Sequence, residues 1–126
     1  MNYVDANILI YSFVDKEEKG RRSVELMDRE KLVTSTLTLD EVAFKLMKRS
    51  REAAVNAVRI ISNSPAIVLV PFLAEDVNAF KELLIKGLKP RDAIHALTAV
   101  KMKCPVIYSE DPDFDKIPEL KRKTPW

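Results

Sequence analysis

The sequence contains little cysteine, histidine or glycine, and it has no long apolar run. The one cysteine, Cys104, excludes an internal disulfide and a zinc site built from cysteines. The one histidine, His95, excludes a multi-histidine metal site and a second catalytic imidazole. The longest apolar stretch, residues 65–74, is about half the length of a membrane-spanning helix and is interrupted by proline. Only 2 glycines and an apolar share of 47% argue against disorder and collagen-like repeats.

The length of 126 residues is typical of one domain, and we expect residues 1–126 to form it. No basic and then apolar leader precedes the first predicted strand, so we expect a cytoplasmic protein that does not enter a membrane. The 21 Lys and Arg residues outnumber the 19 Asp and Glu residues, for a formal net charge of +2. This mildly basic balance is compatible with a polyanionic partner but does not identify one.

Short β-rich runs alternate with helical patterns along the chain. The runs predict strands at residues 1–4, 32–34, 66–70 and 105–108, with an edge strand within the weakly patterned tail 114–126. Helical spacing predicts helices at residues 8–14, 16–30, 38–50, 52–62, 74–86 and 90–102. Gly87 is expected to end the fifth helix, and Pro90 is expected to begin the sixth. This alternation favours an α/β fold with a parallel sheet covered on both faces.

Four carboxylates fall at predicted strand ends and helix starts. Asp5 ends the first strand, Asp111 follows the fourth strand, and Glu41 lies in the first turn of the helix after the second strand. Because ligands of an open α/β sheet bind beyond the carboxyl ends of its strands, these three side chains belong at one edge. Asp92 joins them if the sixth helix begins at Pro90.

Three of these acids also have an ordinary structural explanation. Thr38 and Glu41 have the spacing of a capping box, Asp92 at a helix start favours the helix dipole, and Asp111 suits a helix N-cap. Converging carboxylates repel, however, and two unit charges 4 Å apart cost roughly 4 kcal/mol at an effective dielectric of 20. Protons or a hard cation must offset that repulsion, and oxygen ligands suit Mg²⁺ or Mn²⁺. Such an ion is suited to phosphodiester hydrolysis.

Four segments of the chain resemble, in order, the four motifs of PIN domains. They are residues 3–7 (YVDAN), 35–41 (STLTLDE), 90–96 (PRDAIHA) and 109–114 (SEDPDF). The chain looks most similar to small prokaryotic stand-alone PIN proteins, the VapC-type toxins of toxin–antitoxin pairs. The resemblance implies a three-layer α/β/α sandwich with a central parallel sheet of about five strands. It also implies a Mg²⁺- or Mn²⁺-dependent endoribonuclease that acts on RNA, pairs with an antitoxin protein and forms a homodimer.

The resemblance also implies roles for the acids. By motif position, Asp5, Glu41, Asp92 and Asp111 would form the catalytic, metal-binding cluster. Asp5 and Asp92 would be metal ligands, and Glu41 and Asp111 would complete the site directly or through water. In this mechanism the ion binds the scissile phosphate and a water oriented by Glu41 or Asp111 attacks in line.

Further polar residues are expected around these acids. Asn7 and Ser109 occupy the family's supporting positions, and Asp113 or Asp115 could share the role of the fourth acid. Arg91 and Lys45 are the candidates for contact with the substrate, although most basic residues nearby suit a solvated surface. His95 lies three residues after Asp92 and could hydrogen-bond a site carboxylate, but a histidine on a helix is more often structural.

Two other functions fit the length and the alternation. One is a phosphoacceptor receiver domain, which needs an acidic pair after the first strand and an Asp at the end of the third. Here Ala6 and Asn7 follow Asp5, and Pro71 follows Val70, so the pattern fails twice. The other is a catalytically idle PIN-fold interaction module, and the presence of all four acids argues against it.

Overall fold

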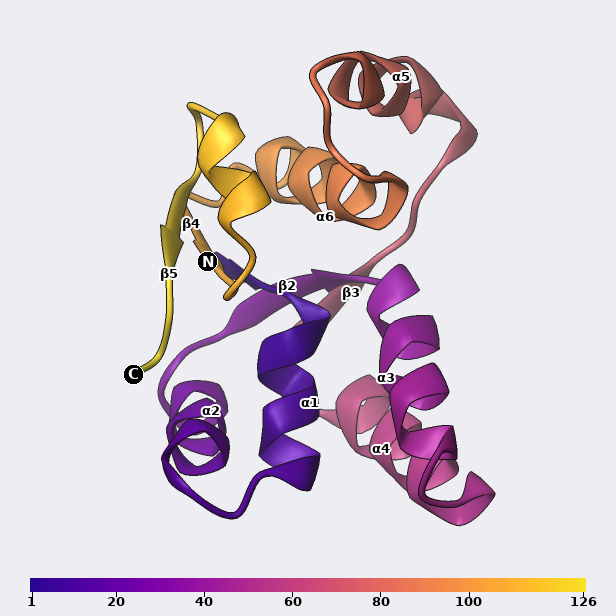
Figure 1. Cartoon of the computed structure of the whole chain (residues 1–126), viewed down its shortest axis with the longest axis vertical. Coiled ribbons are helices and arrows are strands. Elements are labelled where there is room, and N and C mark those ends of the chain that lie inside the picture. Colours follow the sequence, from indigo (N-terminus) through magenta and orange to yellow (C-terminus); the bar gives the residue numbers. More distant parts are fainter.

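Five parallel strands form the centre of the computed structural model, which describes residues 1–126 (Figure 1). The strands are β1 (Asn2–Val4), β2 (Leu32–Ser35), β3 (Ile67–Val70), β4 (Val106–Tyr108) and β5 (Lys121–Lys123). Their order in the sheet is β3-β2-β1-β4-β5, and every neighbouring pair is parallel. The predicted α/β fold, including the edge strand in the tail, is therefore confirmed.

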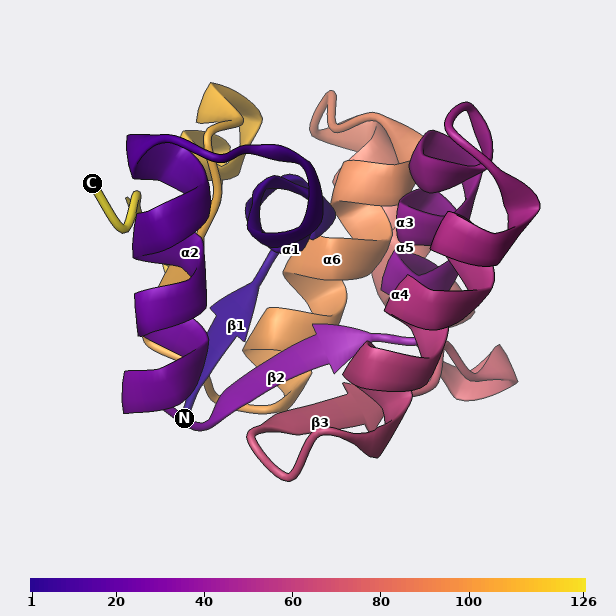
Figure 2. The same cartoon turned by 90° about the horizontal axis from the view of Figure 1, so that it is seen from below.

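Helices cover both faces of this sheet. On one face lie α1 (Ala6–Val14), α2 (Glu18–Arg29), α3 (Leu37–Met47) and α4 (Arg51–Asn63), and on the other lie α5 (Val77–Ile85) and α6 (Pro90–Lys101). Two short 3₁₀ segments, η1 (Ala74–Asp76) and η2 (Pro112–Lys116), complete the chain. Figures 1 and 2 show the resulting three layers, with α1 beginning directly beyond the end of β1. None of these helices has both the length and the apolar character needed to span a bilayer.

Alternation along the strands divides the buried side chains between two cores. Odd and even positions of a strand face opposite sides of the sheet. Val4, Leu32 and Tyr108 join the core beneath α1 to α4, whereas their chain neighbours Tyr3, Val33 and Ile107 join the core beneath α6. Each fully buried apolar side chain contributes about 1.5–3 kcal/mol. Cys104 is buried in the second core.

The turn between α5 and α6 fixes where α6 begins. Gly87 has a positive φ of 99°, and its N–H donates to the Leu84 carbonyl at 3.0 Å. The N–H of Leu88 reaches back to the Leu83 carbonyl at 3.1 Å, which completes a Schellman motif. Pro90 then opens α6 at its first turn, as predicted.

The strand order brings distant segments together at one edge of the sheet. Strands β1 and β4 are neighbours. The chain runs from β1 through β2 to β3 on one side of β1 and then crosses to β4 and β5 on the other side, so the edge between β1 and β4 is a topological switch point. The Asp5 N–H donates to the Tyr108 carbonyl at 3.0 Å, which places the end of β1 beside the end of β4. Asp5 and the segment from Ser109 to Asp111 are therefore spatial neighbours.

Candidate functional site

Asp5 lies at the junction of β1 and α1, where its carboxylate is held by three donors. The side chain is buried, with 5% of the residue exposed. Oδ1 accepts the Ala6 N–H at 2.7 Å, and Oδ2 accepts the Ser109 hydroxyl at 2.6 Å and the Asn7 amide at 3.3 Å. Asp5 is thus the N-cap of α1 as well as a site residue. The structure places Asn7 and Ser109 where they orient Asp5.

Glu41 comes from α3 and meets Asp5 through His95. His95 Nε2 lies 2.5 Å from Glu41 Oε1 and 3.4 Å from Asp5 Oδ1. We call Asp5, Glu41 and His95 the inner group; their potential ligand atoms all lie within 4.8 Å of one another. From the sequence, a hydrogen bond between His95 and a site carboxylate was possible, but a purely structural role was favoured.

The predicted capping box of Thr38 and Glu41 is wrong. Helix α3 begins at Leu37, one residue earlier than predicted, and its N-cap residue Thr36 makes no side-chain cap bond; the Ser35 hydroxyl instead accepts the Leu37 N–H at 3.1 Å. The Thr38 hydroxyl is instead buried against the Thr34 hydroxyl at 2.6 Å. Glu41 is therefore available to contact His95 rather than its own helix end.

Three further acids form a second group, the rim group of Asp92, Asp111 and Asp113. Asp92 occupies the first turn of α6, and Asp111 caps η2 by accepting the Asp113 N–H at 2.9 Å, as the sequence predicted for both. Their potential ligand oxygens also lie within 4.8 Å of one another. Lys116 lies 3.6 Å from Asp113, but no side-chain or backbone donor reaches the Asp92 carboxylate.

A pocket of about 330 Å³ joins the two groups, because Glu41 lines it together with Asp92 and Asp111. Lys89, Pro90 and Arg91 complete its wall, so Arg91, one of the two candidates for substrate contact, lines the pocket. Lys45 does not: it is exposed on α3, lines no part of this pocket and makes no ion pair. The structure therefore separates the two basic candidates.

The pKa values of the acids reflect this arrangement. Burial and the negative charge of Asp111 raise the pKa of Asp92 to about 7. Burial also raises the pKa of Asp5, although His95 and the Ser109 hydroxyl act against the increase. Burial lowers the pKa of His95, but the neighbouring Glu41 and Asp5 carboxylates outweigh it and the net direction is upward. Perturbed groups in one cleft are a signature of functional sites.

The donor chemistry of the pocket fits a hard divalent cation. Besides Lys89 and Arg91, its polar lining consists of three carboxylates from separate elements, Glu41, Asp92 and Asp111, and carboxylate oxygens are the donors that Mg²⁺ and Mn²⁺ prefer. Asn7 adds a buried amide oxygen, Oδ1, that has no hydrogen-bond partner. A positive charge beside Asp92 would act against the burial and the Asp111 charge that raise its pKa.

Two acids in or next to the fourth motif, Glu110 and Asp115, make contacts away from the pocket. Glu110 accepts the Tyr11 hydroxyl and the Lys19 ammonium, at 2.5 Å and 2.7 Å, and so contacts α1 and α2. Asp115 is exposed and forms a two-point ion pair with Arg122, at 3.0 Å and 3.1 Å. Asp113, rather than Asp115, thus lies beside Asp111.

Sequence reasoning missed Tyr3, which stands behind the inner group. Its side chain is fully buried, and its hydroxyl lies 2.6 Å from His95 Nδ1. A tyrosine in an apolar strand gives no signal of such a contact, because the partner is 92 positions away in the sequence.

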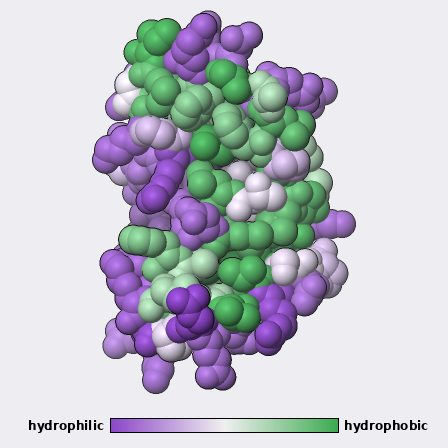
Figure 3. Space-filling view, turned by 90° about the vertical axis from the view of Figure 1, so that its right-hand side faces the viewer, coloured by the Kyte–Doolittle hydropathy of each residue, from purple (hydrophilic) through white to green (hydrophobic).

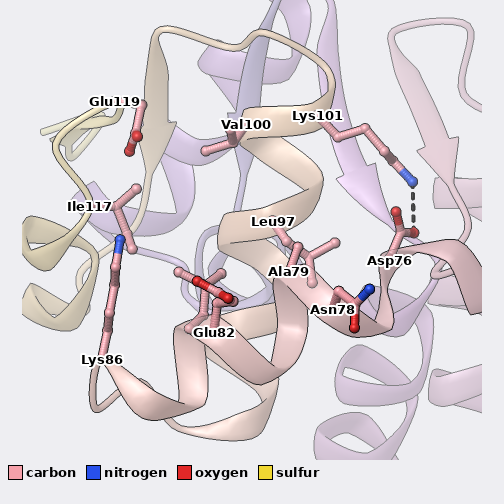
Figure 4. Close-up of a pocket in the computed structure, with 11 residues that line it drawn as sticks. Asp76, Asn78, Ala79, Glu82, Lys86, Leu97, Val100, Lys101, Ile117 and Glu119 are labelled. Atoms are coloured by element: carbon pink, nitrogen blue, oxygen red, sulfur yellow. Dashed lines mark hydrogen bonds and ion pairs between the residues drawn. The ribbon is translucent and has the colours of Figure 1, made fainter.

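A larger hollow of about 600 Å³ lies between α5, α6 and Ile117 (Figure 4). Its floor is apolar, with Leu83, Leu97 and Val100, and an ion pair between Lys101 and Asp76 closes one end. No predicted site residue lines it. Pocket size alone therefore does not locate the acidic site.

Three solved structures share this fold. Mycobacterium tuberculosis VapC20, described as a sarcin–ricin loop cleaving toxin, is 19% identical with a TM-score of 0.79, covering 94% of this chain and 95% of that one. Rickettsia felis VapBC2, bound to a DNA fragment from its promoter, is 20% identical with a TM-score of 0.73 over 98% of both chains. A Klebsiella pneumoniae toxin–antitoxin complex is 21% identical with a TM-score of 0.74, over 100% of this chain and 98% of the other.

Family comparison agrees with the motifs. No curated protein gives a significant sequence match. The family model for the PIN domain, by contrast, matches residues 3–120, which include all four motifs and both carboxylate groups. This chain belongs to the PIN domain family.

Proposed function

We propose that this protein is a metal-dependent endoribonuclease that cleaves RNA phosphodiester bonds as the toxin of a toxin–antitoxin pair. The observation that carries the proposal is the convergence of Glu41, Asp92 and Asp111 on one pocket, with Asp5 directly behind it. Membership in the PIN family and the VapC-like fold support it. The proposal treats residues 1–126 as one domain, which the single sheet shared by both cores supports.

The residues that would hold Mg²⁺ or Mn²⁺ are Asp5, Glu41, Asp92 and Asp111, with Asp113 at the edge of the rim group. Such an ion supplies Lewis-acid chemistry: it polarises the phosphate, acidifies a water and stabilises the leaving oxygen. Carboxylates that repel one another without a cation are suited to bind one tightly.

Protein side chains would bind the RNA phosphate, accept a proton from the water and orient Asp5. Arg91 stands at the pocket wall, where its guanidinium can bind a phosphate oxygen of the RNA backbone. Glu41 lines the same pocket and can accept a proton from the attacking water. Ser109 and Asn7 hold the Asp5 carboxylate in one orientation through their hydrogen bonds.

We also propose an antitoxin partner and a homodimer. Figure 3 shows apolar side chains gathered over the face that carries α3, α4 and α5. Large apolar residues of these helices are exposed, among them Phe44 at 63% and Ile85 at 78%. Such a surface supports association with another protein chain.

The test of catalysis is cleavage of RNA by the purified protein with Mg²⁺ or Mn²⁺. We expect Asp5→Asn and Asp92→Asn each to abolish cleavage while thermal unfolding stays cooperative. Asp115→Asn is the matched control, because this nearby acid pairs with Arg122 outside the pocket, and it should cleave normally. Normal cleavage by Asp92→Asn would refute the assignment, and the idle-module alternative predicts no cleavage by the wild-type chain.

A further inference from the structure

Tyr3 lies behind the inner group and forms a buried pair with His95 that the binding of a cation by the carboxylates does not by itself explain. Tyr3 lies on β1 and is fully buried, and His95 lies on α6 with 1% of the residue exposed. Their rings meet edge to face, with centroids 5.7 Å apart, and Tyr3 Oη lies 2.6 Å from His95 Nδ1. The Ser35 N–H, at the end of β2, donates to the same Tyr3 oxygen at 2.9 Å.

These contacts determine which ring nitrogen carries the proton. A backbone N–H can only donate, so Ser35 occupies a lone pair of the Tyr3 oxygen. Glu41 Oε1 is a carboxylate oxygen and can only accept, so the contact at 2.5 Å requires a hydrogen on His95 Nε2. In the neutral ring, Nδ1 then carries no hydrogen and accepts the Tyr3 hydroxyl.

The Nε2 hydrogen has a specific effect on the carboxylates. It lies between Glu41 Oε1, at 2.5 Å, and Asp5 Oδ1, at 3.4 Å, two oxygens that would otherwise repel each other. No other side-chain donor reaches Glu41. A protonated Nε2 has no lone pair for a metal, so the inner group offers carboxylate oxygens alone to a cation.

We propose that Tyr3 and His95 are positioning residues: through the Nε2 hydrogen, they hold Glu41 beside Asp5 and so assemble the carboxylates before a cation binds. The consequence for RNA cleavage rests on the proposed function, but the protonation of Nε2 and the affinity for a metal do not. His95 is accordingly not a metal ligand, although its nitrogen lies among the carboxylate oxygens of the inner group.

The single histidine makes the first test direct, because every imidazole signal belongs to His95. A long-range ¹H–¹⁵N spectrum of the ¹⁵N-labelled protein should show a hydrogen on Nε2, both alone and with added Mg²⁺. In Tyr3→Phe, which keeps the ring and removes the hydroxyl, the Nδ1 signal should shift. A bare Nε2 in the wild-type protein, or loss of its hydrogen on adding Mg²⁺, would overturn the proposal.

A matched pair of variants supplies the second test. The amide nitrogen of His95→Gln can reach the position of Nε2, whereas that of His95→Asn reaches only the position of Nδ1. We expect His95→Asn to lose at least about tenfold in Mg²⁺ affinity, measured by calorimetry, and His95→Gln to retain most of it. In RNA cleavage, the loss in His95→Asn should fall on kcat more than on KM.

A role limited to packing predicts a different result. Both variants would then lose melting temperature to a similar extent, with equal Mg²⁺ affinities, and that outcome would overturn the proposal. If wild-type protein binds Mg²⁺ and shows the Nε2 hydrogen but cleaves no RNA, the proposed function fails while the positioning pair stands.

Discussion

The inner group and the rim group each bring negatively charged carboxylates close together, but they differ in what offsets the repulsion. In the inner group, hydrogen-bond donors of the protein surround both carboxylates. Asp5 accepts hydrogen bonds from Ala6, Ser109 and Asn7, and Glu41 accepts one from His95. In the rim group no hydrogen-bond donor reaches Asp92, and the charge of Asp111 adds to burial in raising its pKa. The fold thus supplies donors to the carboxylates of the inner group, whereas Asp92 in the rim group has none and would gain most from a proton or a cation.

This difference in hydrogen-bond donors suggests different roles for the two groups: the inner group contributes to the stability of the fold, and the rim group to the binding of a cation. The pKa of Asp5 and of Asp92 both rise, but burial acts against hydrogen-bond donors at Asp5 and together with Asp111 at Asp92. Substitutions should therefore change stability in opposite directions in the two groups. A carboxylate with hydrogen-bond donors stabilises the fold through those bonds. A carboxylate without donors keeps a negative charge that a cation can offset.

The largest expected effect on stability is from Asp5→Ala. This change removes the cap of α1 and leaves the buried Ser109 hydroxyl without its acceptor, and we expect a loss of about 2 kcal/mol. Chemical unfolding of the metal-free protein measures it. A loss below about 0.5 kcal/mol would show that the hydrogen bonds of the inner group do not stabilise the fold.

The opposite sign is expected for Asp92→Asn without metal. Replacing the charge removes its repulsion with Asp111, and because the side chain is half-buried, solvent screens much of the effect. We expect a gain of about 1 kcal/mol near pH 8, equivalent to a rise of about 4 °C in melting temperature. A clear decrease would mean that Asp92 has a stabilising partner and that the two groups do not differ.

The difference between wild type and Asp92→Asn should itself depend on pH. The pKa of Asp92 is about 7 in the folded chain and about 4 in an unfolded one, so folding favours the protonated form. The stabilising contribution of the protonated Asp92 side chain is complete below about pH 4 and is lost as the pH rises through about 7. Melting curves between pH 5 and 8 should therefore diverge with rising pH. Parallel curves would contradict the raised pKa.

The smallest effect is expected from Glu110→Gln. Its contacts with Tyr11 and Lys19 lie at a partly exposed surface, where ion pairs contribute about 0–1 kcal/mol. The change should lower stability by less than about 1 kcal/mol and leave Mg²⁺ affinity unchanged. A loss of Mg²⁺ affinity, measured by calorimetry, would extend the site beyond the two groups.

Much of this architecture follows from local patterns. Alternating strands and helices, with Gly87 and Pro90 as end and start signals, predicted the parallel sheet and the six helices. From the sequence alone, the topological rule then predicts that Asp5 and Asp111 lie at one edge of the sheet. Local signals suffice here because chain direction and strand ends are encoded within a few neighbouring residues.

The division into two groups could not be predicted in the same way. The capping-box spacing of Thr38 and Glu41 is a local signal, but the tertiary contact with His95 overrode it. Tyr3 and His95 meet only because β1 passes beneath α6, which no spacing reveals. Lys45 was expected near the substrate, but the position of its side chain depends on how α3 is rotated about its axis. In the structure this rotation leaves Lys45 exposed and outside the pocket.

The central claim is that the rim group requires a divalent cation, and thermal unfolding with and without Mn²⁺ at pH 8 tests it most directly. We predict that a saturating concentration, about 100 times Kd, stabilises the wild-type protein by about 2.7 kcal/mol, which raises its melting temperature by several degrees. Asp92→Asn should respond far less. An unchanged wild-type melting temperature, or an equal rise in both proteins, would contradict the account.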